Sequence, residues 1–203
     1  MAEIRSGLRG ILADPRWYEA VQSLMGSKRA RQAFVDKYVR PRRGDRILDI
    51  GCGPGELVRY LPDVAYFGFD PNPDYIARAT QTFGSRGQFH AKEFGEDDVA
   101  SLRSVDIAVI SAVLHHLEDA EARNLLTLVR RVLRPGGRLV TIDNVFIPHQ
   151  NPIARLLISL DRGRNVRSPE GYRALAAGVF GTIDAEIAHK SFPPYTYFIM
   201  TMS

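Results

Sequence analysis

From residue 46 onward, short apolar runs of strand length alternate with stretches in which apolar residues recur at helical spacing. This alternation predicts βαβ units arranged around a mostly parallel sheet. The predicted fold class is therefore α/β, a three-layer sandwich with a seven-stranded, mostly parallel sheet between helices. Residues 189–196 have the length of a hairpin connection, so the last strand should run antiparallel to the others. We expect the seven strands at residues 46–50, 65–69, 88–90, 105–110, 138–142, 182–188 and 197–202.

Caps and breakers mark helix boundaries at three places. Apolar residues within 125–132 recur at helical spacing, and the Arg-Pro-Gly-Gly segment 134–137 should end that helix. Asn72 and Ser168 each precede a proline, which places a capping side chain before a proline at the first helical position. These two positions predict two further helix starts.

Two segments fall outside the alternation, and both are expected to cover the carboxyl edge of the sheet. The first looks helical, and the second lies between the fifth and sixth strands. Because no repeat or flexible linker is present, we predict one domain over residues 1–203. Its predicted parts are a helical N-terminal cap (1–40), a core (41–143), an insertion (144–178) and a C-terminal strand pair (179–203).

The composition is that of a soluble globular protein, with 45% hydrophobic and 25% charged residues among 203. No apolar run approaches the roughly 18 residues that a membrane span requires, and the N-terminus lacks the apolar centre of a secretory signal. We therefore predict a cytoplasmic protein. The single cysteine, Cys52, excludes an internal disulfide and a cysteine-cluster metal site, and the scattered histidines predict no other metal site.

The net charge of +4 comes almost wholly from arginine. A nucleic-acid-binding protein would typically have a contiguous basic face interleaved with aromatic residues. The densest basic clusters here, at residues 28–31, 40–46 and 162–167, are separated in the sequence. Nucleic acid is therefore not the expected partner.

Residues 47–56 predict a buried strand that runs into a glycine-rich turn and then a helix. Gly51, Gly53 and Gly55 allow φ values that are closed to other residues, and they let the backbone approach a ligand closely. A dinucleotide-binding turn needs a small residue and a free helix N-terminus at the place of Glu56, whose carboxylate would repel a phosphate. The loop therefore suits a ligand without phosphate.

Asp70 ends the next apolar strand, about 20 positions after the glycine turn. An acid at that place can accept hydrogen bonds from both hydroxyls of a ribose. The alternative is that Asp70 only caps the turn before Pro71. Together with the glycine turn, Asp70 predicts an adenosine-containing ligand.

These motifs resemble those of the class I S-adenosylmethionine-dependent methyltransferases, in their small-molecule subgroup, over roughly residues 27–142. The segment LDIGCGPG is similar to their motif I. The resemblance implies S-adenosylmethionine as cofactor and S-adenosylhomocysteine as product, bound by the core 41–143. It implies that the glycines pass under the methionine part, that Asp49 organises the loop or meets the cofactor's amino group, and that Asp70 takes the ribose hydroxyls. The implied cofactor-binding residues are Asp49, Gly51, Cys52, Gly53, Gly55, Asp70, Pro71, Asn72, Glu93, Phe94 and Ser111.

The adenine contacts in that set come from the segment after the third strand, where the family often has Gly-Asp-Ala. The matching residues are the Lys-Glu-Phe of 92–94, so the resemblance implies that Glu93 meets the adenine amino group and that Phe94 lies beside the ring. A solvated acidic loop is the alternative. Neighbouring acids that could serve instead are Glu96, Asp97 and Asp98.

Residues 111–119, SAVLHHLED, resemble the segment after the fourth strand in small-molecule members of the family. At the carboxyl end of a central strand this segment should line the methyl-transfer site. His115 and His116 are the candidate catalytic residues, because an imidazole can take a proton from an attacking hydroxyl or amine near neutral pH. The alternative is that one imidazole, His115 first, is only packed into the structure.

In this family a cap over the carboxyl edge selects the acceptor, so the resemblance makes 144–178 the substrate cap. Three arginines lie close together there, and arginine binds carboxylate or phosphate through two hydrogen bonds. We therefore expect an anionic small-molecule acceptor, with a solvated basic loop as the alternative. The candidate substrate-binding residues are Arg162, Arg164, Arg167 and Tyr172.

The predicted function is S-adenosylmethionine-dependent methyl transfer to an oxygen or nitrogen of a small-molecule acceptor. One alternative is a nucleic-acid methyltransferase, although this chain has Ser-Ala-Val-Leu where amino-methylating enzymes have an Asn- or Asp-Pro-Pro-aromatic motif. A second alternative is a nicotinamide-dependent oxidoreductase, but the Glu56 carboxylate would repel the phosphates of its dinucleotide. A non-catalytic protein that binds S-adenosylmethionine is a third. The acceptor and the oligomeric state are left open.

Overall fold

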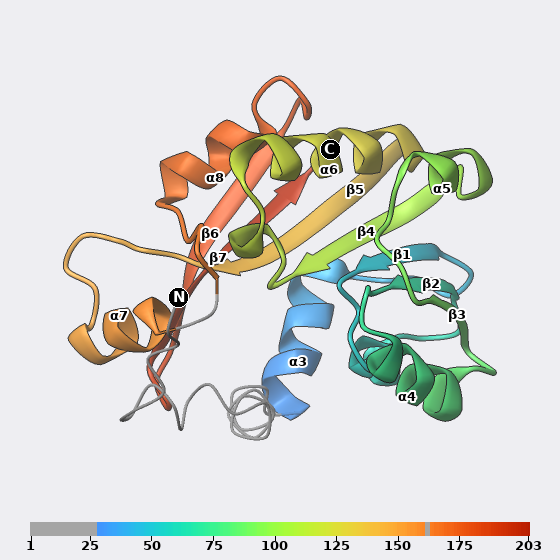
Figure 1. Ribbon diagram of the computed structural model, residues 1–203, viewed down its shortest axis with the longest axis horizontal. Helices are drawn as coiled ribbons and strands as arrows, with labels where there is room; N and C mark the ends of the chain where they lie inside the picture. The colour runs from blue at the N-terminus through green and yellow to red at the C-terminus, as the bar shows by residue number, and fades with distance from the viewer. Residues whose placement is uncertain (1–27, 161–162) are drawn as a thin grey trace, which may run out of the picture.

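The structure is a computed structural model that describes residues 28–160 and 163–203. Its centre is a seven-stranded sheet with the strand order β3-β2-β1-β4-β5-β7-β6 (Figure 1). Strands β1 to β5 are parallel to one another, and β7 lies antiparallel between β5 and β6. The predicted α/β fold is confirmed. The strands are β1 Arg46–Ile50, β2 Ala65–Phe69, β3 Gly87–His90, β4 Val105–Ser111, β5 Leu133–Asn144, β6 Ile183–Lys190 and β7 Tyr195–Met202.

Strand β5 begins earlier than the sequence predicts. The segment 134–137 does end the preceding helix, but the chain continues directly as a strand, and Leu133 pairs with Val105 on β4. The register then shifts before Arg138 pairs with Ile107. Residue 136 within this irregularity is a glycine at φ +74°, a backbone conformation that glycine adopts without strain.

Helices cover both faces of the sheet, because alternate strand residues point to opposite sides. Ile107 and Val109 of β4 belong to a core with η1 and η2, whereas Ala108 and Ile110 belong to a core with α5, α6 and α8. Figure 1 shows α5, α6 and α8 on one side and α3 and α4 on the other. The bounds are α3 Lys28–Phe34, η1 Val35–Val39, η2 Glu56–Tyr60, α4 Pro73–Phe83, α5 Glu96–Ser101, α6 Asp119–Val132 and α8 Pro169–Ala176.

Both capped helix starts are confirmed. The Asn72 side chain accepts hydrogen bonds from the first-turn amides of α4, and the Ser168 side chain accepts one from the first turn of α8. Each helix has proline at its first position, where no backbone N–H is needed. These local signals place α4 directly after the end of β2.

The two segments outside the alternation differ from each other. Residues 28–39 are helical, as predicted for the N-terminal cap, and residues 1–27 lie outside the described residues. In the insertion, α7 (Pro152–Ser159) packs on β7, whereas α8 packs on α6 behind the sheet. Residues 163–167 also reach the carboxyl edge, where the Asn165 N–H donates to the His115 oxygen, so within the described part of 144–178 it is α8 that lies away from this edge. No helix within 28–160 and 163–203 is both long and apolar enough to cross a membrane.

Candidate active site

A cleft of about 1690 Å³ opens at the carboxyl ends of the central strands. This volume exceeds the roughly 300–1,000 Å³ that holds one drug-sized ligand, so there is room for two ligands side by side. We call one part the glycine-loop half, lined by residues 49–54, 56–57, 69–71 and 92–94. The other is the β7 half, lined by the two histidines of the turn η3 (Leu114–His116), the ends of β5, β6 and β7, and residues of α3, η1 and α7.

The glycine turn has the backbone conformation that the sequence predicts. Gly51 and Gly53 have φ of +72° and +52°, and both line the cleft. A Cβ on Gly51 would lie 2.3 Å from Cγ2 of Val113, whereas a Cβ on Gly53 would meet nothing within 4 Å. Gly55 does not line the cleft, since it packs against Phe83 and Phe89. Gly53 therefore presents bare backbone to a ligand, and Gly51 and Gly55 are required by packing.

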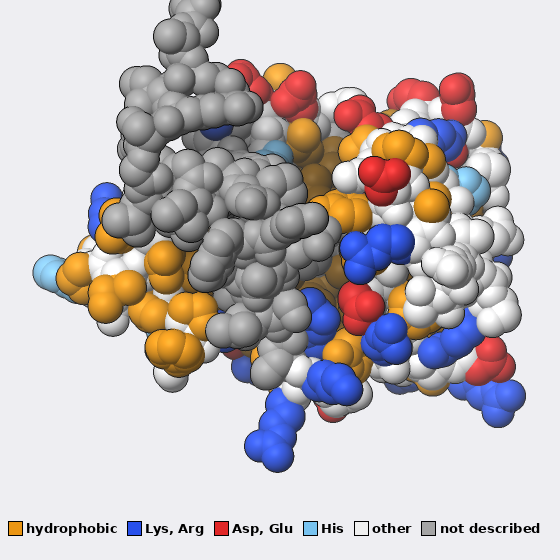
Figure 2. All heavy atoms as spheres, turned by 60° about the horizontal axis from the view of Figure 1, so that its bottom comes forward, with side chains coloured by type: hydrophobic (Ala, Val, Ile, Leu, Met, Phe, Trp, Pro, Cys, Tyr) orange, Lys and Arg blue, Asp and Glu red, His pale blue; other side chains and the backbone are white. Residues whose placement is uncertain are grey.

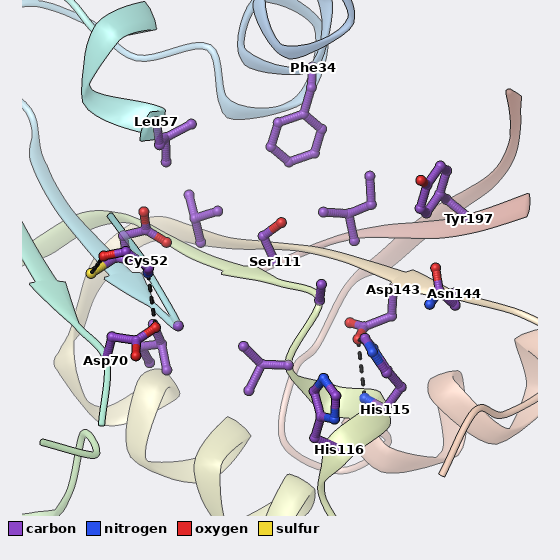
Figure 3. A pocket seen from close by; sticks show the side chains of 18 of the residues that line it. Phe34, Cys52, Leu57, Asp70, Ser111, His115, His116, Asp143, Asn144 and Tyr197 are labelled. Atoms are coloured by element: carbon purple, nitrogen blue, oxygen red, sulfur yellow. Dashed lines mark hydrogen bonds and ion pairs between the residues drawn. The ribbon is translucent and has the colours of Figure 1, made fainter. Parts of the chain in front are cut away.

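Asp70 joins the glycine turn to the end of β2. One carboxylate oxygen accepts the backbone N–H of Gly53 at 2.9 Å (Figure 3), and the other accepts that of Asn72 at 2.9 Å. Asp70 therefore also caps the turn before Pro71, which was the alternative interpretation of this residue. Each carboxylate oxygen has two acceptor sites, so both keep one for a ligand hydroxyl. Asn72 does not line the cleft, and its side chain caps α4 instead.

Asp49 lies beneath the glycine turn and is 3% exposed. Its Oδ2 accepts a hydrogen bond of 2.5 Å from the Tyr66 hydroxyl. Burial raises the pKa of Asp49 to about 7, and the charge of Asp70 adds to this rise while the Tyr66 hydrogen bond opposes it. Neighbouring Cys52 also lines the cleft, and burial raises the pKa of its thiol.

An aromatic wall closes the far end of the glycine-loop half. Phe94 meets Phe69 edge-to-face with ring centroids 5.3 Å apart, and both line the cleft beside the exposed Glu93. The neighbouring acids do not line it. Glu96 pairs with Arg131, and Asp98 caps α5 and pairs with Lys92. Glu93 is therefore the acid of this loop that faces the cleft.

His115 and Asp143 form a buried pair in the β7 half, 1% and 2% exposed. His115 Nδ1 lies 2.8 Å from Asp143 Oδ1, which also accepts the backbone N–H of His115 (Figure 3). Because the carboxylate only accepts, Nδ1 carries the proton and Nε2 keeps its lone pair. Within residues 28–160 and 163–203, His115 Nε2 and Asp143 Oδ2 are buried without a hydrogen-bond partner. Buried polar atoms without a partner are rare in native structures, and a catalytic role is one reason for them.

The sequence reasoning did not include Asp143 among the candidate residues. Like Asp70, Asp143 is an acidic residue at the carboxyl end of a central strand, and this position in the sequence could have indicated it as a candidate. Burial raises the pKa of Asp143, and hydrogen bonding to His115 opposes this rise.

The comparisons with known proteins agree with this geometry. Residues 48–139 match a family described as a methyltransferase domain. Acetylserotonin O-methyltransferase of Bos taurus is 32% identical over 168 residues, which are 71% of this chain and 47% of that protein. The apo crystal structure of the S-adenosylmethionine-dependent methyltransferase SibL has a TM-score of 0.71 at 16% identity, covering 93% of this chain and 57% of that one. The chain belongs to the class I S-adenosylmethionine-dependent methyltransferases.

A further solved structure shares the fold. Human N-acetylserotonin methyltransferase in complex with S-adenosylmethionine has a TM-score of 0.60 at 22% identity, covering 77% of this chain and 46% of that one. The cofactor of this methyltransferase is S-adenosylmethionine. The chain spans about half the length of the curated relatives that it matches. The nicotinamide alternative is wrong, since the family is that of the methyltransferases.

The arginine prediction for the acceptor needs correction. All five guanidinium N–H groups of Arg167 donate within the protein, to Asp119 and to the backbone oxygens of Leu114, Leu117 and Asn165. No donor of Arg167 is therefore left for an anionic acceptor. The bonds to residues 114 and 117 instead hold both ends of η3.

Tyr172 and Arg164 do not supply the predicted anion site either. Tyr172 is 1% exposed and outside the cleft, and its hydroxyl donates to the backbone oxygen of Asn144 at 2.8 Å. Tyr172 thus holds the end of β5 from the side of the sheet that α8 covers. Arg164 is exposed and does not line the cleft, and Arg162 lies outside the described residues.

Other features of the surface bear on the remaining predictions. His116 is exposed, lines the cleft and lies with its ring centroid 4.2 Å from that of His115. Among the described residues on the face drawn in Figure 2, Lys and Arg side chains stand beside acidic and apolar ones. In the described part of the chain, no three His, Cys, Asp or Glu side chains could hold a metal ion.

Proposed function

We propose that this methyltransferase transfers a methyl group to a hydroxyl oxygen of a small-molecule acceptor, with His115 as the general base and Asp143 as its positioning residue. The observation that carries the proposal is the pair itself, in which Nδ1–H is held by a carboxylate and Nε2 is unpartnered within the described residues. A hydroxyl is a weak nucleophile until its proton is removed, which is the task that such an imidazole performs.

The glycine-loop half fits the cofactor. Gly53 offers open backbone, Asp70 keeps acceptor sites for the two ribose hydroxyls, and Phe94 offers an apolar edge for the adenine with Glu93 beside it. Asp49 would organise the loop from below. When bound, the cofactor supplies a methyl group that its sulfonium already activates.

The protein's own contribution is then positioning and one proton transfer. Ser111 ends the central strand β4 and His115 follows it in the next turn, and both side chains line the cleft between the glycine loop and β7 (Figure 3). Orientation can supply effective molarities of about 10⁵–10⁸ M, whereas a general base adds about 10²- to 10⁴-fold. Replacement of His115 should therefore slow the reaction and leave measurable turnover.

The test is production of S-adenosylhomocysteine and methyl ether from a panel of hydroxyl compounds, by the intact chain and by His115→Gln. We expect kcat to fall by about 10²- to 10⁴-fold in the variant with unchanged cofactor affinity. His149→Asn is the matched control, because His149 is exposed, outside the cleft and at φ +54°, which asparagine tolerates. Equal kcat in His115→Gln and wild type would contradict the assignment of the base.

A further inference from the structure

Strand β6 ends the sheet, and in the part of the chain that the structure describes no strand pairs with its outer side. Along an antiparallel pair, residues that exchange both N–H···O bonds with the neighbouring strand alternate with residues that point these groups away from it. Thr182, just before β6, exchanges both bonds with Ser203. Counting along the strand from this pair, Ala185, Ile187 and His189 point their N–H and C=O groups away from β7.

The outer edge of β6 is covered only at its beginning by a hydrogen bond that the structure records. Arg173 of α8 donates to the backbone oxygen of Ile183 at 3.0 Å, so this outward acceptor is in use. Ile187, in the middle of the strand, is 39% exposed although its side chain is large and apolar. Outward backbone groups beside an exposed apolar side chain form a template on which another strand can pair. The edge therefore fits an added strand.

The charges of β6 make the strand complementary to itself. Asp184 lies near its beginning and Lys190 at its end, so two antiparallel copies can bring opposite charges together. When two copies pair around a two-fold axis at Ile187, Ala185 of each copy lies opposite His189 of the other. This register pairs all three outward residues with one another. It also places Asp184 of each copy directly opposite Lys190 of the other.

Neighbouring symmetric registers are less favourable. A two-fold axis at Ala185 would set Asp184 against Glu186, and an axis at Glu186 would set that carboxylate against its own copy. An axis at Ala188 would pair Lys190 with Glu186, whose carboxylate already accepts hydrogen bonds from two side chains of η1. Charge therefore favours the register in which Asp184 and Lys190 meet.

We propose that two copies of this chain associate through their β6 edges, antiparallel and in the register centred on Ile187, so that the two sheets become one continuous sheet. The Asp184 carboxylate of each copy pairs with the Lys190 ammonium of the other. Because Lys190 lines the cleft, each copy adds a carboxylate beside the cleft of the other. Burial lowers the pKa of Lys190, and a carboxylate beside it opposes that lowering.

Sedimentation equilibrium of the intact chain, at concentrations up to about 1 mM, tests the association. We expect a reversible dimer of twice the 22.7 kDa of one chain. Ile187→Pro should abolish it with little change in the thermal unfolding midpoint, because proline is tolerated where a strand N–H faces outward but cannot donate to a second strand. Ile187→Val keeps the N–H and should dimerise as wild type does. A wild-type monomer at every concentration, as expected if another segment covers this edge, would overturn the proposal.

A charge exchange tests the register, and it remains decisive if Ile187→Pro does not fold. Asp184→Lys and Lys190→Asp should each raise the dissociation constant of the dimer about 10-fold or more, because each replaces two attractive cross-strand pairs by two repulsive ones. The double variant should restore the wild-type value. Asp97→Lys is the matched control, since it makes the same change at an exposed residue of α5. Dimerisation that neither single variant weakens, or that the double variant does not restore, would overturn the proposal.

Amide hydrogen exchange, followed by NMR, locates the interface residue by residue. As the concentration of the chain rises, the amides of Ala185, Ile187 and His189 should exchange more slowly, in proportion to the fraction of dimer. The amides of Asp184 and Ala188 already bond to β7 and should change little. Protection that grows elsewhere but not at the three outward amides would place the interface outside β6 and overturn the proposal.

Discussion

The two halves of the cleft are built in different ways. The glycine-loop half is made mainly of two short loops after neighbouring strands β1 and β2, and Asp70 ties one loop to the other through Gly53. The β7 half draws on residues as far apart in sequence as Phe34, His115, Asp143 and Tyr197. The first half is therefore set by local backbone geometry, and the second depends on the order in which strands are placed. A site formed mainly by backbone atoms suits a ligand that is always the same. A site formed by side chains from many elements can be altered by substitution to suit a different acceptor.

The largest expected effect lies in the glycine-loop half. Asp70→Ala should weaken S-adenosylhomocysteine binding by about 10²- to 10⁴-fold, because two hydrogen bonds to a charged acceptor are lost at about 1.5–3 kcal/mol each. Calorimetry measures this directly. Near-normal cofactor affinity in Asp70→Ala would contradict the proposal that Asp70 binds the ribose hydroxyls.

The next effect belongs to the β7 half. Asp143→Asn should lower kcat by about 10- to 100-fold, because an amide can stabilise the wrong tautomer of His115 and does not stabilise its protonated form. The pH dependence of kcat should change as well, which a merely structural role would not produce. Cofactor affinity measured on the same protein serves as the control, and a pH profile identical to that of wild type would argue against the pair.

Substitutions at Gly51 and Gly53 should distinguish a glycine required by packing from one required for ligand contact. Gly51→Ala should lower the free energy of unfolding by about 2–4 kcal/mol, because its Cβ would meet Val113 and its φ is positive. Gly53→Ala should cost only about 1–2 kcal/mol of stability, since its Cβ would point into open space. Its affinity for S-adenosylhomocysteine should nevertheless fall. Chemical denaturation and calorimetry together check the pair, and the reverse ranking of stabilities would contradict this geometry.

Asp49 predicts a pH dependence of stability. Its pKa in the folded chain, about 7, lies above the ordinary value of 3.8, so the folded state binds the proton more tightly than the unfolded state does. The free energy of unfolding should therefore fall as the pH rises from about 4 to 7. Asp49→Asn should show less of this fall in denaturation curves without cofactor. If the free energy of unfolding fell more steeply with pH in Asp49→Asn than in wild type, the raised pKa of Asp49 would be contradicted.

The smallest effect is expected at Arg164, one of the arginines predicted to bind the acceptor. Arg164→Ala should change neither stability nor acceptor KM, since its side chain is exposed and outside the cleft. Arg167→Ala should lower stability by a few kcal/mol and lower kcat through η3, because it removes the donors for Leu114 and Leu117. A rise in acceptor KM with Arg164→Ala at unchanged stability would restore the anion-binding interpretation.

The sequence could predict what short-range signals determine. The seven strands, the caps at Asn72 and Ser168, and the glycine turn with Asp70 all follow from local patterns. The β7 half could not be predicted in this way, because Tyr197 faces Asn144 only through the antiparallel insertion of β7 between β5 and β6. Arg167 was misread for a related reason, since its partners lie about 50 residues away in sequence on η3 and at the start of α6.

The most direct measurement is a crystal structure of this methyltransferase with S-adenosylhomocysteine. The account predicts that both ribose hydroxyls donate to Asp70, that the amino-acid part lies over Gly51 and Gly53, and that the sulfur faces the space between Ser111 and His115. An adenosine bound away from Asp70, or a sulfur turned away from His115, would contradict the arrangement of the two halves.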